Sequence, residues 1–84
     1  MPRFYFDVRD DEDLVRDDQG VEFSDIEAAR SEAAVALAEM ARDVLSRSPR
    51  RRMAIEVRTE GEPLLRLSLA YDLERLSGAG GPVR

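Results

Sequence analysis

The sequence predicts an α+β fold of the order strand-strand-helix-strand-strand, in which one long helix covers one face of one antiparallel sheet. Two observations carry this prediction. Apolar and polar residues alternate over residues 3–9, 53–58 and 64–69, as they do in strands with one buried face. Between these segments, apolar residues recur at spacings of three and four over residues 24–48, which is typical of an amphipathic helix.

The length of 84 residues allows one domain, because there is no room for a second hydrophobic core. We assign the domain to residues 1–76. Residues 77–84 hold three of the five glycines and a proline, so we expect a disordered C-terminal tail there.

Two strands are expected before the helix. The aromatic strand over residues 3–9 is the clearest in the chain. The four acids at 10–13 repel one another and cannot be buried together, so they predict an exposed turn before a short return strand over residues 14–16. A second turn over residues 17–20 ends in a glycine, which easily adopts a positive φ, and leads towards the helix.

The helix start is predicted from a capping-box pattern. Ser24 is followed three residues later by Glu27, and Asp25 adds negative charge at the positive end of the helix dipole. We expect the helix to stop near Pro49, since the residue before a proline is pushed out of the α region. Its apolar stripe consists of Ile26, Ala29, Ala33, Leu37, Met40 and Val44.

Two further strands are expected after the helix, over residues 53–58 and 63–69, with Pro63 suited to a strand start at a sheet edge. We expect Arg50–Arg52 at the C-terminal end of the helix, where positive charge complements the dipole. Residues 70–76 are compatible with one helical turn.

The expected strand order across the sheet is second-first-third-fourth, all antiparallel, with the aromatic strand central. One face meets the helix, and we expect Phe6 to be among its most buried residues. The residues of that face are Phe4, Phe6, Val8, Met53, Ile55, Val57, Leu65, Leu67 and Leu69. The other face shows Arg3, Tyr5, Asp7, Arg9, Arg58 and Arg66 to solvent or to a partner.

Composition narrows the functional classes. The chain contains no cysteine, histidine or lysine, which excludes a disulfide, argues against a zinc site and removes the usual nucleophiles and bases. We therefore predict no enzyme activity and no cofactor. The N-terminus enters a strand without a signal-peptide core, and no apolar run is long enough to span a membrane, so we expect a cytoplasmic soluble protein without a membrane partner.

The acidic residues before the helix are weighed as a cation site. Calcium and magnesium bind several carboxylate oxygens, but the spacing here lacks the turning glycine and the closing glutamate of an EF-hand loop. We predict two solvated turns and no metal site. The cluster consists of Asp10, Asp11, Glu12, Asp13, Asp17 and Asp18.

Three segments resemble a family of small uncharacterised bacterial proteins described as a domain of unknown function. They are PRFYFDVR at 2–9, DQGVEF at 18–23 and DIEAARSEA at 25–33, and the resemblance covers most of residues 2–69. Members of that family often have histidine where this chain has Asp7, which argues against essential histidine chemistry there. The resemblance implies a fold and brings no activity, cofactor or catalytic residue.

Two functional hypotheses follow. The leading one is a non-enzymatic module that binds a protein partner or a second copy of itself. The alternative is a regulator associated with nucleic acid that uses the arginine-rich open sheet face; the layout is similar to that of HicB-like antitoxins, without a shared motif. The net charge of −5 disfavours general binding to phosphate. The candidate interaction surface consists of Arg3, Tyr5, Arg58, Arg66, Val44, Leu45 and Leu64.

Self-association is predicted from lengths. A helix from Asp25 to Arg47 spans about 34 Å, whereas a seven-residue strand covers only about 23 Å. Its last turns, with Val44 and Leu45, would then overhang the sheet and be covered by a second copy, giving a homodimer. In the alternative, residues 70–76 fold back over this overhang and leave a monomer.

Overall fold

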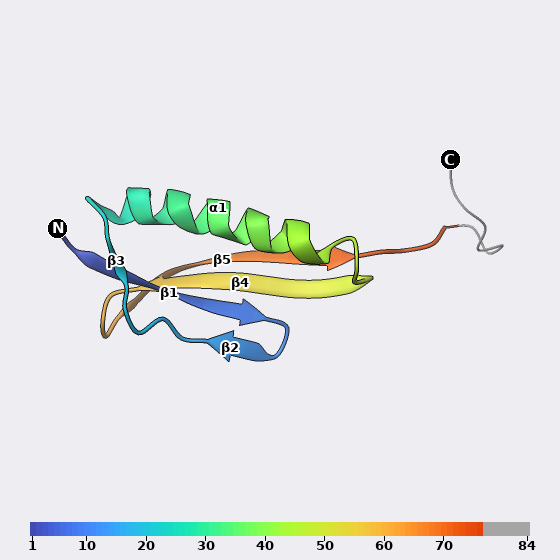
Figure 1. Cartoon of the computed structure of the whole chain (residues 1–84), viewed down its shortest axis with the longest axis horizontal. Coiled ribbons are helices and arrows are strands. Elements are labelled where there is room, and N and C mark those ends of the chain that lie inside the picture. The colour runs from blue at the N-terminus through green and yellow to red at the C-terminus, as the bar shows by residue number, and fades with distance from the viewer. Residues whose placement is uncertain (77–84) are drawn as a thin grey trace.

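The computed structural model describes residues 1–76 and has the predicted α+β fold, with one helix lying along one face of one antiparallel sheet (Figure 1). The elements are β1 Arg3–Asp10, β2 Asp13–Val15, β3 Val21–Glu22, α1 Ile26–Val44, β4 Arg50–Arg58 and β5 Pro63–Asp72. The tail predicted over 77–84 lies outside the described residues.

The sheet order is β2-β1-β4-β5, which confirms the order predicted for the four expected strands. The two-residue strand β3 was not predicted. It pairs with the start of β1, Val21 opposite Phe4, while β2 pairs with the other end of β1, Val15 opposite Val8. Both short strands therefore share the outer edge of β1, and β5 lies at the opposite edge of the sheet.

The helix begins one residue later than predicted. Its N-cap is Asp25, whose Oδ1 accepts the backbone N–H of Ala28 at 2.9 Å. The capping box with Ser24 is therefore wrong, and Glu27 forms an ion pair with Arg30 instead. Asp25 caps the helix N-terminus because its carboxylate accepts a free N–H of the first turn and places negative charge at the positive end of the helix dipole. No helix within residues 1–76 is long and apolar enough to cross a membrane.

The later strands are longer than predicted. β4 starts at Arg50, so the three arginines that were predicted to stand at the C-terminal end of the helix are the first residues of a strand. β5 continues to Asp72, which replaces the predicted helical turn, and Arg50 Nε lies 3.2 Å from Asp72 Oδ1 across the ladder. The three cross-strand pairs of residues 50–52 with residues 70–72 outweigh the weak local signal for a helical turn.

These lengths remove the predicted overhang. A 19-residue helix measures about 28 Å, and the nine residues of β4 measure about 30 Å. Val44 and Leu45 are half-buried against the core, so the self-association argument built on the overhang is wrong. The fold-back alternative also fails, because Leu73 and Leu76 remain 51% and 92% exposed.

The core lies between the helix and the middle of the sheet. Its buried members are Phe4, Ala29, Ala33, Leu37, Ala41, Met53, Ile55 and Val57. Three alanines at multiples of four residues give the helix a smooth ridge that can approach β4 closely. Phe6 was predicted to be among the most buried residues but is only half-buried. Phe4, at 5% exposure, is the buried phenylalanine of β1 instead. The Phe23 ring lies 6.3 Å from that of Phe4 and 5.8 Å from that of Phe6.

We expect Gly20→Ala to lower the free energy of unfolding by about 1–3 kcal/mol. Gly20 has a φ of +73°, and a Cβ there would lie 2.8 Å from Arg3 Cγ and 3.0 Å from the Phe4 carbonyl oxygen. Gly61→Ala is the matched control, since a Cβ there meets nothing within 4 Å, and it should stay within about 0.5 kcal/mol. Urea denaturation of the two variants measures both values, and equal effects would contradict this packing of the loop before β3.

Candidate functional site

The sheet face away from the helix carries most of the residues predicted to form an interaction surface. They come from β1, β4 and β5 and are Arg3, Tyr5, Arg58, Leu64 and Arg66; Asp7, Arg9 and Glu56 lie on the same face. The prediction that all the polar ones face solvent is wrong at two positions. Asp7 is 3% exposed, and the Arg58 side chain is 13% exposed.

Among residues 1–76, Asp7 is the buried carboxylate. Its Oδ2 accepts Arg58 Nε at 2.8 Å, and its Oδ1 accepts the backbone N–H of Asp17 at 3.0 Å. Burial raises the pKa of Asp7, but the hydrogen bonds from Arg58 and Asp17 outweigh it, so the pKa lies below its ordinary value of 3.8. Asp7 is therefore an ionised structural anchor between β1, β4 and the loop before β3.

Arg58 is hydrogen-bonded within the fold through Nε and both terminal nitrogens. Besides Asp7, it donates to the Asp17 carbonyl at 2.8 Å and to the Thr59 and Glu60 carbonyls at 3.2 Å each. Its guanidinium carbon lies 4.7 Å from the centre of the Tyr5 ring, within the range of a cation–π contact. Arg58 and Tyr5 were both predicted to belong to an interaction surface, and in the fold they stack on each other.

Asp17 organises the loop that leads to β3. Its Oδ2 accepts the Phe6 N–H at 3.1 Å, and its Oδ1 accepts the N–H groups of Gln19 and Gly20 at 3.0 and 3.1 Å. Burial raises the pKa of Asp17, but these three N–H groups outweigh it and hold the pKa below 3.8. Asp17 was predicted to be a solvated turn residue and is half-buried. The spacing of Asp17 and Gly20, typical of a side-chain-bonded turn, is the signal that could have indicated this.

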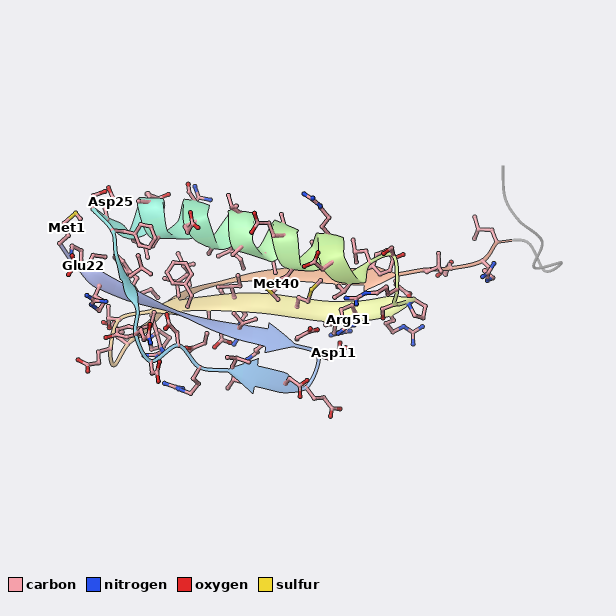
Figure 2. The ribbon with its side chains drawn as sticks, in the orientation of Figure 1. Met1, Asp11, Glu22, Asp25, Met40 and Arg51 are labelled. Carbon is pink, nitrogen blue, oxygen red and sulfur yellow. The ribbon has the colours of Figure 1, made fainter. Side chains whose placement is uncertain are left out.

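Arg3 and the acidic hairpin are also tied to neighbouring groups. Arg3 donates to the Gln19 and Gly20 carbonyls and pairs with Glu22 at 3.4 Å. At the far end of the sheet, Arg51 lies 2.9 Å from Asp10 and 3.7 Å from Asp11 (Figure 2). Within residues 1–76, no cluster of three or more acidic side chains is arranged to hold a metal ion.

A shallow hollow of about 550 Å³ lies on the open face beside β5. Its lining is Arg9, Asp11, Arg52, Met53, Ala54, Arg66, Ser68, Leu69 and Ala70. Arg9 Nε and Arg66 Nη2 both approach Glu56 Oε2, at 3.1 and 2.7 Å. Burial raises the pKa of Glu56, but the hydrogen bonds from Arg9 and Arg66 outweigh it and lower the pKa. Two of the arginines at the hollow therefore already have a carboxylate partner.

The outer edge of β5 is open: within residues 1–76, β5 pairs with β4 alone. The Leu73 N–H donates to the Pro49 carbonyl at 2.8 Å, so these two residues form a hydrogen-bonded pair of the β4–β5 ladder. Hydrogen-bonded pairs recur at every second residue along an antiparallel ladder. Backbone groups of odd-numbered residues therefore point towards β4, and those of even-numbered residues point outwards. The outward groups belong to Arg66, Ser68, Ala70 and Asp72.

Apolar side chains flank this edge. Leu65, Leu67 and Leu69 lie on the helix side and are half-buried, while Leu64 lies on the open face and is 39% exposed. Of the seven residues predicted to form the interaction surface, Leu64 and Arg66 are the two that lie on β5. Arg66 also pairs with Glu56, and the other five residues pack or bond within the fold: Arg3, Tyr5, Val44, Leu45 and Arg58.

Comparison with known proteins identifies a family. The family model described as Domain of unknown function (DUF6894) matches residues 3–70, and the chain belongs to this family. The match runs from the first residue of β1 into β5, so it covers the whole α+β arrangement, and it confirms the resemblance predicted from the sequence. No curated protein and no solved structure matches the chain.

We expect Asp7→Asn to lower the free energy of unfolding by about 3 kcal/mol at pH 7, because Arg58 loses its carboxylate in a buried site. Glu56→Gln, between two exposed arginines, is the control and should cost about 1 kcal/mol or less. Urea denaturation measures both.

The pH dependence of this difference has a fixed sign. The folded-state pKa of Asp7 lies below 3.8, so its stabilisation is complete above about pH 3.8 and is lost as pH falls through the folded-state value. The wild-type protein and Asp7→Asn should therefore converge in acid. A difference that stays constant down to low pH would contradict an ionised Asp7.

Proposed function

We propose that this member of the DUF6894 family is a non-enzymatic module that binds another polypeptide along the open edge of β5. The observation that carries the proposal is a ten-residue strand whose outer backbone groups have no strand beside them within residues 1–76. Exposed strand edges of this length are either protected from pairing or used for binding, because they offer a row of hydrogen-bond donors and acceptors to an added strand.

The other edge of the sheet supports this proposal by contrast. There, β2 and β3 cover the two ends of β1, and the Asp17 carboxylate takes up the Phe6 N–H between them. On β5 no such cover exists within residues 1–76, and the sole charges of the strand are Arg66 and Asp72. Neither lies on the face with the leucines, so an added strand would meet an apolar row on that face.

A second candidate is binding of single-stranded nucleic acid at the hollow, and the observation in its favour is Arg52. Arg52 lines the hollow, and none of the ion pairs within residues 1–76 involves it. Against it, Arg9 and Arg66 are paired with Glu56, Arg58 is bonded internally, and the net charge is −5. We favour edge pairing, because it accounts for the open strand edge of β5 and its apolar row, whereas most arginines near the hollow are already paired.

The test uses a labelled synthetic peptide with the sequence of residues 63–73, and its binding to the full chain is followed by fluorescence anisotropy. We expect saturable binding that Ser68→Pro weakens at least about tenfold, because proline removes an outward N–H without removing a bond to β4. Ser68→Thr keeps the N–H and is the matched control.

Three outcomes would contradict edge pairing. The first is equal binding of the peptide by Ser68→Pro and Ser68→Thr, and the second is no binding by the wild-type chain. The third is retention of labelled single-stranded RNA that falls steeply with salt and is lost in Arg52→Ala, which would favour the second candidate.

A further inference from the structure

We infer that the strand added to β5 is β5 of a second copy, paired antiparallel with Leu69 opposite Leu69 at the two-fold axis. This inference rests on the proposed function and names its partner. The two sheets then form one continuous sheet, and both helices lie on the same side of it.

The direction of the backbone groups sets the first constraint. Even-numbered residues of β5 point their N–H and C=O groups outwards, so the two copies bond only if even-numbered residues stand opposite even-numbered ones. Odd-numbered residues then also stand opposite one another. Because side chains alternate along a strand, the apolar helix-side row of one copy meets the same row of the other.

Charge selects the register among those that satisfy this constraint. With Leu69 at the axis, Arg66 of each copy stands opposite Asp72 of the other, and Ser68 stands opposite Ala70. These are the two charged residues of β5, and both lie on the open face. Cross-strand pairs of opposite charge stabilise a sheet, and like pairs destabilise it.

On the helix side of the sheet, the same register places apolar side chains opposite one another. Leu69 meets its own copy, Leu67 meets Tyr71, and Leu65 meets Leu73. The pairing thereby places an apolar neighbour against Leu73, which is 51% exposed in one copy.

The neighbouring registers are worse. An axis at Ser68 places Leu64 opposite Asp72 and leaves Arg66 opposite Ala70. An axis at Ala70 pairs Arg66 with Glu74, but it places Leu65 opposite Arg75 on the apolar face. Among the three registers, the one at Leu69 alone places Arg66 opposite Asp72 and also keeps the residues of the helix-side apolar row opposite one another; in it Leu64 stands opposite Glu74.

The side chains at the junction extend an existing charge pattern. Asp72 is already paired with Arg50, and Arg66 with Glu56, and these side chains are exposed enough to reach across the edge, at 56% for Asp72 and 61% for Arg66. The pairing of two copies links them into an alternating row of Arg50, Asp72, Arg66 and Glu56 across each half of the junction.

Charge exchange tests the register by sedimentation equilibrium of the full chain. We expect a wild-type dimer at tens of micromolar, weakened at least about tenfold by Arg66→Glu or by Asp72→Arg, since each places two like-charged pairs across the edge. An equimolar mixture of the two variants should dimerise again, because both cross-strand pairs become Glu–Arg or Arg–Asp. A mixture as weak as its components would overturn the register.

Cysteine cross-linking gives a second, independent readout. The chain has no cysteine, so a disulfide in Leu69→Cys joins two copies. At the axis the two Cα atoms are about 4.5 Å apart, within the reach of a disulfide. Leu67→Cys, on the same face, is the matched control and should stay reduced. Faster cross-linking of Leu67→Cys would overturn the register.

A wild-type chain that stays monomeric at tens of micromolar would overturn the self-pairing. If such a chain still binds the peptide and Ser68→Pro weakens that binding, the dimer is overturned and the proposed function stands; if the peptide does not bind either, the proposed function is contradicted as well.

Discussion

The contact between Asp7 and Arg58, completed by Asp17, is the constraint on which the rest of the fold depends. It joins the middle of β1 to the end of β4 and holds the loop that carries Gly20 and β3 against the sheet. A buried ion pair is retained only where hydrogen bonds satisfy its remaining polar atoms. Here the Asp17 backbone supplies both an N–H for the carboxylate and a carbonyl for the guanidinium, which is why this loop has one defined position.

The same network makes the two edges of the sheet different. The Asp17 carboxylate fills the gap between β2 and β3, so the β1 edge is covered along residues 3–10. The β5 edge has no equivalent acidic loop within residues 1–76. A sheet closed on one side and open on the other can be extended in one direction only, and this favours a pair of chains over an open-ended assembly.

The sequence was enough to predict the fold class, the four longer strands and their order, because alternation and the helical stripe are local patterns. It missed what depends on contacts between distant residues. Asp7 was predicted to face solvent like its polar neighbours on the strand, because its partners Asp17 and Arg58 lie ten and 51 positions away in the sequence. The extension of β5 to Asp72 depends on pairing with Arg50, and the burial of Phe4 ahead of Phe6 depends on where the helix crosses the sheet.

At the candidate site, Leu64 and Arg66 were predicted correctly to lie on an edge strand, whereas Tyr5 and Arg58 pack against each other.

Amide hydrogen exchange, followed by NMR at several protein concentrations, tests both edges in one measurement. The Phe6 and Asp17 amides, bonded to carboxylates, should be protected at every concentration, although neither bonds to another strand. The Ser68 and Ala70 amides should exchange rapidly in dilute solution and gain protection as concentration rises. Rapid exchange at Phe6 and Asp17, or protection at Ser68 and Ala70 that does not change with concentration, would contradict a sheet closed at β1 and open at β5.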